Sequence, residues 1–379
     1  MKIAFIKRKR FSHINASLRA QLERCFPDYE IEELDVFRDF IVRRPDVVVR
    51  NVFAILASYG RDILRGRRKL NLCFYRTPYI FHAIRRFLRA RYAPRLSDYA
   101  FSFATQSLYD ASIPGLPHFI YTDHTHLANR DYPDFPPDGF FSREWIDLER
   151  EIYLHARRVF VPGENTQRSL IKHYGCEPGR ALCVYAGSNF QSSAPPPLAN
   201  DGYRNQTIAF VGIDWERKGG PELVTAFHHV LDRLPKARLI IIGASPAISH
   251  PRIEIAGRLP VAEVQQRLTR ASLLCLPSRI EPFGIAVIEG FSLKLPVIVT
   301  RVGALPGLVR DHETGRVVEP QNPAALADAL IDLLSDPAKS RRCGEAGYRF
   351  MMENCTWDAV GNKIRREIET ALRRPAETA

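Results

Sequence analysis

Short apolar runs alternate with longer segments of helical periodicity through the second half of the chain. Strands are predicted at residues 207–211, 238–242, 252–256, 272–276 and 297–300, and helices at 222–234, 261–270, 283–293 and 323–334. Short buried strands separated by amphipathic helices are typical of a parallel sheet that is covered on both faces. This half is therefore predicted to be a doubly wound α/β domain, in which ligands bind at the carboxyl ends of the strands.

The first half is less regular but carries the same kind of pattern. Strands are predicted at residues 2–6, 47–49, 101–104, 118–121 and 158–161. The stretch 191–206 is polar and contains three consecutive prolines, Pro195–Pro197, so it is predicted to be a linker between domains. The final helical stretch spans 357–373. The expected domains are 1–190 and 207–355, followed by a C-terminal segment 356–379.

Length and composition agree with two folded domains. The chain has 379 residues, 45% of them hydrophobic and 25% charged, and one hydrophobic core rarely serves so long a chain. No apolar run is long enough to cross a membrane, and Met1–Ile6 is predicted to be a strand instead of a signal peptide. The seven cysteines are scattered and form no CxxC pair, which argues against a disulfide framework or a zinc site and favours the cytoplasm.

Positive charge is concentrated near the N-terminus. Residues 1–100 hold 22 Lys and Arg against 10 Asp and Glu, a difference of +12 that equals the net charge of the whole chain. A field of this sign attracts an anionic membrane surface, a phosphorylated substrate or nucleic acid. No nucleic-acid-binding motif is visible, so nucleic acid is not expected as a partner. Solvated helix faces explain the charge equally well.

The segment Gly212–Gly220 follows a predicted strand and precedes a predicted helix. Its glycines permit a ligand to approach the backbone, the helix N-terminus offers free N–H groups, and Arg217 and Lys218 add positive charge. This combination indicates phosphate binding, although a solvated helix start has the same pattern. The order of residues is not that of a P-loop.

The segment Pro277–Glu289 carries two carboxylates around a helix start. Glu281 precedes the helix and Glu289 lies about two turns into it, in an otherwise apolar stretch. Carboxylates accept hydrogen bonds from sugar hydroxyls, so the pair could hold a hexose and a ribose on either side of a diphosphate. Alone, Glu281 could equally be a helix cap or a surface residue, whereas a carboxylate in an apolar helix requires a partner.

These two segments, in this order, resemble the retaining glycosyltransferases of family 4, which have the GT-B fold. The elements that carry the resemblance are Lys218-Gly219, Gly257, Pro277-Ser278, the pair Glu281 and Glu289, Pro296-Val297-Ile298, Gly303 and Thr314-Gly315. The resemblance implies two Rossmann-like doubly wound domains that face a cleft, with residues 1–190 binding the acceptor and 207–355 the donor. The segment 356–379 is expected to pack back toward the N-terminal domain.

The resemblance also implies an activity and the roles of individual residues. The expected reaction is that of a hexosyltransferase, which transfers a sugar from a nucleoside diphosphate sugar to an acceptor hydroxyl, expected on a cell-envelope glycan or glycolipid, without metal or cofactor. The expected catalytic residues are Glu281, Lys218 and His124, with His126 as the second choice for the histidine. The expected donor-binding residues are Gly212, Arg217, Lys218, Arg258, Leu259, Ser278, Glu281, Phe283, Gly284, Ile285 and Glu289.

In these roles Lys218 would hold the diphosphate, Glu281 the donor sugar and Glu289 the ribose. Backbone N–H groups of Phe283, Gly284 and Ile285 would contact phosphate or sugar. Arg258 and Leu259 would line the base.

Several positions depart from the family pattern. Ile213 stands where an arginine is usual, and Arg217 is the candidate replacement. Lys294 replaces a glycine, which should be neutral, and Gly307 replaces a nearby glutamate. The segment 7–12 is basic instead of glycine-rich, which would suit a phosphorylated, uronic or membrane-held acceptor, or be surface charge. The alternatives are a non-catalytic nucleotide-sugar or anionic-surface binding module and a GT-B epimerase. A peripheral position at the inner membrane face stays open.

Overall fold

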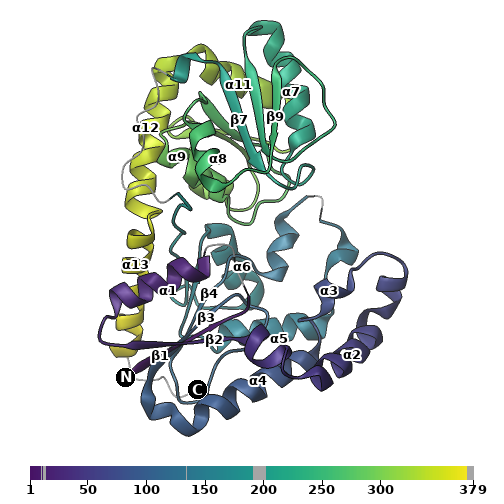
Figure 1. Cartoon of the computed structure of the whole chain (residues 1–379), viewed down its shortest axis with the longest axis vertical. Helices are drawn as coiled ribbons and strands as arrows, with labels where there is room; N and C mark the ends of the chain where they lie inside the picture. The colour runs from purple at the N-terminus through teal and green to yellow at the C-terminus, as the bar shows by residue number, and fades with distance from the viewer. Residues whose placement is uncertain (10, 12–13, 134, 191–201, 374–379) are drawn as a thin grey trace. The chain divides into compact units, whose positions relative to one another are not determined.

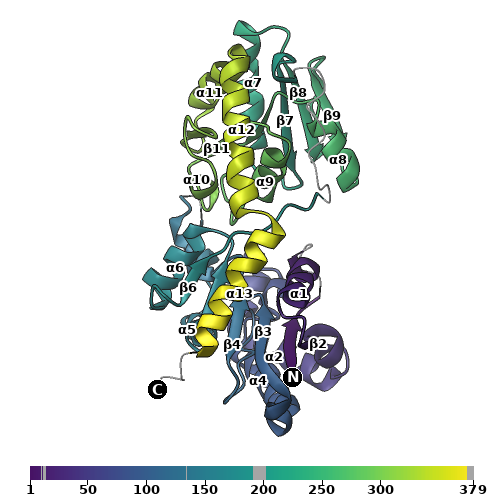
Figure 2. The same ribbon diagram turned by 90° about the vertical axis from the view of Figure 1, so that its left-hand side faces the viewer.

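The structure is a computed structural model that describes residues 1–9, 11, 14–133, 135–190 and 202–373 (Figures 1 and 2). It consists of two compact units, the first formed by residues 1–184 together with the chain from Gly361 onward, and the second by residues 185–360. These limits differ from the predicted ranges, because residues 185–190 belong to the second unit. Most of the predicted linker, 191–201, lies outside the described residues, as do Arg10 and Ser12 of the basic segment near the N-terminus.

The first unit contains a six-stranded parallel sheet in the order β2-β1-β3-β4-β5-β6. The strands are β1 (Lys2–Lys7), β2 (Glu30–Asp35), β3 (Tyr99–Thr105), β4 (His118–Tyr121), β5 (Arg158–Val161) and β6 (Ala181–Cys183). The helices are α1 (Ile14–Cys25), α2 (Pro45–Leu64), α3 (Leu70–Cys73), α4 (Pro78–Tyr92), α5 (Arg143–Leu154) and α6 (Glu164–Tyr174). A π-helix (Phe37–Ile41) and short 3-10 turns complete this unit.

The second unit also contains a six-stranded parallel sheet, in the order β12-β11-β10-β7-β8-β9. The strands are β7 (Thr207–Gly212), β8 (Arg238–Gly243), β9 (Ile253–Gly257), β10 (Leu273–Leu276), β11 (Val297–Thr300) and β12 (Gly315–Val318). The helices are α7 (Gly220–Arg233), α8 (Val261–Leu268), α9 (Ile285–Ser292), α10 (Leu305–Leu308), α11 (Pro323–Ser335) and α12 (Pro337–Asn354). The last helix, α13 (Trp357–Arg373), begins in this unit and ends in the first.

Each sheet is buried between two layers of helices, as the continuous apolar strands predict. In the second unit α7 and α11 pack on one face of β7, β8 and β10, where Phe227 and Leu330 are fully buried. On the other face, α12 packs against α9 through the rings of Phe291 and Phe350, and α12 crosses the near side of this unit in Figure 2. The predicted doubly wound α/β class is therefore confirmed for both sheets.

In the first unit, α1 and the later part of α13 cover the same face of the sheet. Leu18 and Leu22 of α1 and Ile364 of α13 lie together around Phe103 of β3. Arg24 of α1 donates a hydrogen bond to Asn362 of α13, with 2.8 Å between Nη2 and Oδ1. The opposite face is covered by α4, α5 and α6.

One predicted strand is wrong. Residues 47–49 lie in α2, which starts with Pro45 at its first position and buries Val47, Asn51, Ile55 and Tyr59. Three adjacent valines favour a strand locally, but the spacing of four between these buried positions places them on one helical face. The decisive pattern therefore extends well beyond the three valines.

Along the described residues, no helix has the length and apolar content that crossing a bilayer requires.

Candidate functional site

The centre of the second sheet is a topological switch point. The chain runs from β7 through β8 to β9 on one side, then returns to β10 beside β7 and continues to β11 and β12 on the other side. The connections after β7 and β10 therefore leave toward opposite faces of the sheet, and doubly wound sheets bind ligands at the carboxyl ends of the strands at such a point. Both segments predicted from sequence, 212–220 and 277–289, begin here.

Lys218 and Glu281 form an ion pair between these two connections. Lys218 Nζ contacts Glu281 Oε2, and the side chains are only 13% and 7% exposed. Ser278 Oγ donates a hydrogen bond of 3.3 Å to the same carboxylate oxygen. The backbone carbonyl of Glu281 accepts a hydrogen bond of 3.2 Å from Ala304 N, which ties this loop to the one after β11. Three predicted site residues are thus brought together.

Two glycines permit this close approach of the loops. Gly219 has a φ of +75°, and a Cβ there would lie 1.8 Å from the carbonyl oxygen of Pro277. Gly284 has a φ of +95° and precedes the first residue of α9, Ile285. The first N–H groups of a helix have no acceptor inside the helix, so the start of α9 can bind an anion or a hydroxyl group. Phe283 beside it is buried.

Glu289 lies in the second turn of α9 and is buried. Its side chain accepts a hydrogen bond of 3.0 Å from Asn189 Nδ2. Burial raises the pKa of Glu289 to about 7, an effect opposed by this hydrogen bond and by the positive charge of Lys218. The carboxyl group is therefore close enough to Lys218 for the two to interact. Asn189 was not anticipated, because nothing in the sequence links it to a residue 100 positions away.

Arg217, the candidate replacement for the arginine that is usual at position 213, is already bound to other residues of the two loops. Its guanidinium donates to the carbonyl of Ile280 at 2.8 Å and pairs with Asp214 at 3.2 Å. Its carbonyl accepts from the backbone N–H of Arg279 at 2.9 Å. Arg217 therefore joins the two loops, while the side chain of Ile213 is exposed.

The remaining predicted residues are further apart. Gly212 ends β7 next to the side chain of Lys218. Arg258 and Leu259 follow β9, which lies two strands from β7 at the edge of the sheet. Arg258 is exposed and Leu259 is half-buried.

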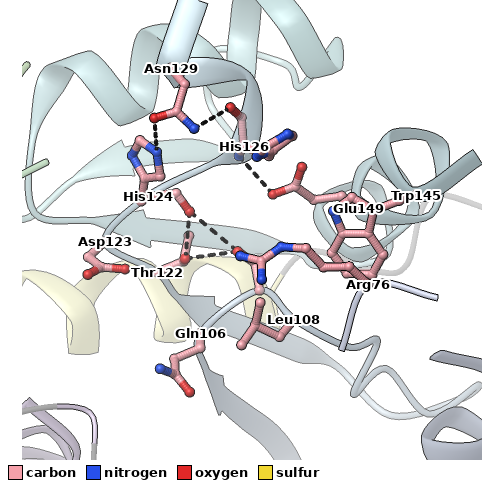
Figure 3. A pocket seen from close by; sticks show the side chains of 11 residues that line it. Arg76, Gln106, Leu108, Thr122, Asp123, His124, His126, Asn129, Trp145 and Glu149 are labelled. Atoms are coloured by element: carbon pink, nitrogen blue, oxygen red, sulfur yellow. Dashed lines mark hydrogen bonds between the residues drawn. The ribbon is translucent and has the colours of Figure 1, made fainter. Parts of the chain in front are cut away.

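The first unit has its own polar cavity of about 180 Å³ at the carboxyl ends of β3 and β4 (Figure 3). His124 and Asp123 line it from the loop after β4, and Arg76 lines it from the segment before α4. Burial raises the pKa of Asp123 to about 6 and lowers the pKa of His124 to about 4. The imidazole of His124 is therefore neutral at physiological pH.

The hydrogen bonds of Asn129 define the tautomer of His124 (Figure 3). Asn129 Nδ2 donates to the carbonyl of His126 at 2.9 Å, which orients the amide. Its Oδ1 lies 3.0 Å from His124 Nε2, so Nε2 carries the proton and donates. Nδ1 of His124 is then an acceptor, and it is buried with no partner among the described residues. It can accept a hydrogen bond from a ligand hydroxyl.

His126, the second choice, is committed to the fold. The Nε2 of its imidazole accepts a hydrogen bond of 2.9 Å from the backbone N–H of Phe141. The backbone N–H of His126 donates to Glu149 Oε1 at 3.0 Å. Burial lowers its pKa to about 3. Within the described residues no group of three His, Cys, Asp or Glu side chains is placed to hold a metal ion.

Residues 202–350 match the family model described as "Glycosyl transferases group 1". The chain is 26% identical over 271 residues to D-inositol 3-phosphate glycosyltransferase of Corynebacterium diphtheriae, covering 65% of this chain and 63% of that protein. It is 30% identical over 241 residues to the enzyme of the same name in Streptomyces avermitilis, covering 56% and 52%. The matches thus span roughly half to two-thirds of these relatives.

Two solved structures have the same fold. Sucrose-phosphate synthase from Thermosynechococcus elongatus aligns with a TM-score of 0.67 at 16% identity, over 98% of both chains. Anabaena HepE in complex with UDP and glucose aligns with a TM-score of 0.63 at 15% identity, over 98% of this chain and 100% of that one. The chain therefore has a GT-B-like fold, and its residues 202–350 are similar to the glycosyltransferase group 1 domain.

Proposed function

We propose that this protein is a retaining, metal-independent glycosyltransferase. It transfers a sugar from a nucleoside diphosphate sugar to a hydroxyl group of a glycan or glycolipid acceptor. The proposed compartment is the cytoplasm, in keeping with seven cysteines that are scattered along the sequence and form no CxxC pair. UDP-glucose is the first donor to test, because HepE, which shares the fold, has been solved with it.

The observation that carries this proposal is the position of the Lys218–Glu281 pair. A cation and a carboxylate meet at the switch point of the second sheet, beside the start of α9. A diphosphate requires positive charge and N–H donors, and a hexose requires hydrogen-bond acceptors. Both kinds of group occur here within one small region, and the carboxyl of Glu289 lies near the same lysine.

The proposed mechanism depends on electrostatics and orientation. On donor binding, Lys218 turns from Glu281 to the diphosphate, while Glu281 accepts hydrogen bonds from hydroxyls of the donor sugar. As the bond between sugar and phosphate breaks, the N–H groups at the start of α9 and Lys218 stabilise the charge on the leaving diphosphate. A phosphate oxygen takes the proton of the acceptor hydroxyl, which attacks from the same face. The configuration at the sugar carbon is thereby retained.

Three further assignments belong to this proposal. Glu289, held by Asn189, binds the ribose, and Arg258 and Leu259 line the base. His124 accepts a hydroxyl hydrogen at Nδ1, because this nitrogen is an acceptor without a partner among the described residues. A neutral imidazole in this tautomer suits hydrogen bonding to a sugar better than proton donation.

The test is release of nucleoside diphosphate from a panel of nucleotide sugars, with and without glycan and glycolipid acceptors. We expect release with one donor, an increase when an acceptor is present, and activity that survives a chelator. Nuclear magnetic resonance of the product should show the anomeric configuration of the donor. An inverted product contradicts the retaining mechanism. Binding of a nucleotide sugar without release of nucleoside diphosphate identifies a binding module instead. Conversion of the free nucleotide sugar into another nucleotide sugar identifies an epimerase.

A further inference from the structure

The segment from Val42 to Leu72 holds most of the strongly exposed large apolar side chains of the described residues. Seven of the twelve large apolar side chains that are strongly exposed lie within it. Such a concentration marks an interaction surface, whereas single exposed apolar residues do not. These side chains are Val42, Val49, Phe53, Leu56, Leu64, Leu70 and Leu72.

Four of them lie along one face of α2. Val49, Phe53, Leu56 and Leu64 follow helical spacing, with Gly60 on the same line. We call these four residues the α2 stripe. Phe53 is 68% exposed and Leu64 is 89% exposed, so neither packs against the unit. Figure 1 draws α2 and α3 at the outer edge of the first unit, away from its sheet.

The opposite face of α2 fixes the rotation of the helix. Asn51 Nδ2 donates to the carbonyl of Phe74 at 2.7 Å, and its Oδ1 accepts from Thr77 Oγ1 at 2.5 Å. About two turns further along α2, Tyr59 OH donates a hydrogen bond to the carbonyl of Arg76 at 2.7 Å. Turning the stripe inward would break these buried hydrogen bonds, which is costly. The stripe therefore faces outward as part of the fold.

Positive charge accompanies the stripe. Residues 42–72 contain eight Lys and Arg and two Asp and Glu, a net charge of +6. Both acidic residues are paired, Asp46 with Arg44 and Asp62 with Arg68. Arg50, Arg61 and Arg65 are exposed, make no ion pair among the described residues, and lie along one flank of the stripe at helical spacing.

We propose that the α2 stripe docks the protein on an anionic membrane surface. Its apolar side chains enter the boundary between headgroups and acyl chains, and the flanking arginines contact lipid phosphates. The combination of an apolar face with unpaired cations complements an anionic bilayer. A second copy of this chain would bring like charges together. The proposal goes beyond glycosyl transfer and does not require it, since docking is measured without donor.

The experiment is sedimentation of the full chain with vesicles of phosphatidylcholine, alone or mixed with phosphatidylglycerol. In physiological salt, wild type should sediment with the anionic vesicles and should not sediment with the neutral ones. Phe53→Ser/Leu64→Ser should weaken binding by roughly tenfold or more. Arg50→Gln/Arg61→Gln should weaken it by roughly fivefold for each charge, with a smaller dependence on salt.

The matched control is Leu154→Ser/Val261→Ser, which removes two exposed apolar side chains outside the segment and should bind like wild type. Circular dichroism checks that all variants fold. Equal vesicle binding by the stripe variant and wild type overturns the proposal. The proposal is also overturned if wild type self-associates without binding vesicles and the stripe variant no longer self-associates. The stripe is then an interface between copies of the chain. Nucleoside diphosphate release with a water-soluble acceptor should be the same in the stripe variant and wild type, so a failed transferase assay and failed docking are distinguishable.

Discussion

At the scale of single residues, the Lys218–Glu281 pair is the most direct test of the proposed donor site. Lys218→Ala and Glu281→Ala should each lower turnover by a factor of about 100 or more, because each removes a group that stabilises the leaving diphosphate or orients the sugar. The ratio kcat/KM for donor is the measurement. The control is the exposed pair Arg301 and Glu319 in the same unit, whose alanine variants should keep full activity. Unchanged turnover in Lys218→Ala would place the site elsewhere.

Glu289 should make the stability of the second unit depend on pH. Its pKa is about 7 in the folded chain against 4.5 in a model peptide, so the folded state keeps a proton that the unfolded state loses. Stability is therefore highest at low pH and decreases as the pH rises from 4.5 to 7, by about 3 kcal/mol at most.

Glu289→Gln removes this loss, because an amide cannot ionise and can still accept from Asn189. The melting temperature of the variant should exceed that of wild type by several degrees above pH 7, with little difference near pH 5. Glu345→Gln, which changes an exposed carboxylate on α12, serves as the control and should show no such trend. A constant difference at all pH values would mean that Glu289 stays ionised throughout.

At the scale of elements, the turn between β7 and α7 determines whether the two site loops can meet. Gly219→Ala adds a methyl group 1.8 Å from the Pro277 carbonyl, at a φ of +75°. Gly175→Ala is a matched control, since Gly175 ends α6 with a φ of +74° but has no atom within 4 Å of the added group. The control should lose about 1 kcal/mol, whereas Gly219→Ala should lose more and also lose donor affinity. Equal losses in unfolding free energy would show that the loops are not in contact.

Several elements could be predicted from sequence to the residue, and the failures have physical causes. Strands 118–121, 158–161 and 297–300 are apolar runs between clear turns, and the structure has the same limits. β2 was missed because its sequence, EIEELD, is mostly acidic. An edge strand with one neighbour, β1, tolerates such charge.

The site was predictable where it depends on local pattern and not where it depends on distant contacts. Lys218 and Glu281 follow neighbouring strands, so a parallel sheet brings their loops together. The hydrogen bond from Asn189 to Glu289 joins positions 100 residues apart. The engagement of Arg217 by Ile280 and Asp214 likewise depends on loop conformation. Neither leaves a signal in a single sequence.

At the scale of the whole molecule, acid should act on the two units in opposite directions. In the first unit burial lowers the pKa of His118 and His124 to about 4 and of His126 to about 3, from 6.5. Near pH 5 the unfolded chain binds nearly three protons at these residues that the folded chain does not. Burial also raises the pKa of Asp123 to about 6 and the pKa of Glu149, so the folded chain gains up to two protons.

Near pH 5 the unfolded first unit therefore binds at least one proton more than the folded one, and its stability should fall there by about 1.4 kcal/mol or more for each pH unit of acidification. The second unit should instead gain stability on acidification, because Glu289 is protonated in the folded state first. Hydrogen exchange with mass spectrometry, corrected for intrinsic rates, separates the two. Peptides from β3 to β5 should lose protection near pH 5 relative to about pH 7, while peptides from β7 to β11 should gain it. Glu289→Gln should abolish the gain and leave the loss unchanged, and a parallel change in both units would show that their stabilities are not governed by these buried groups.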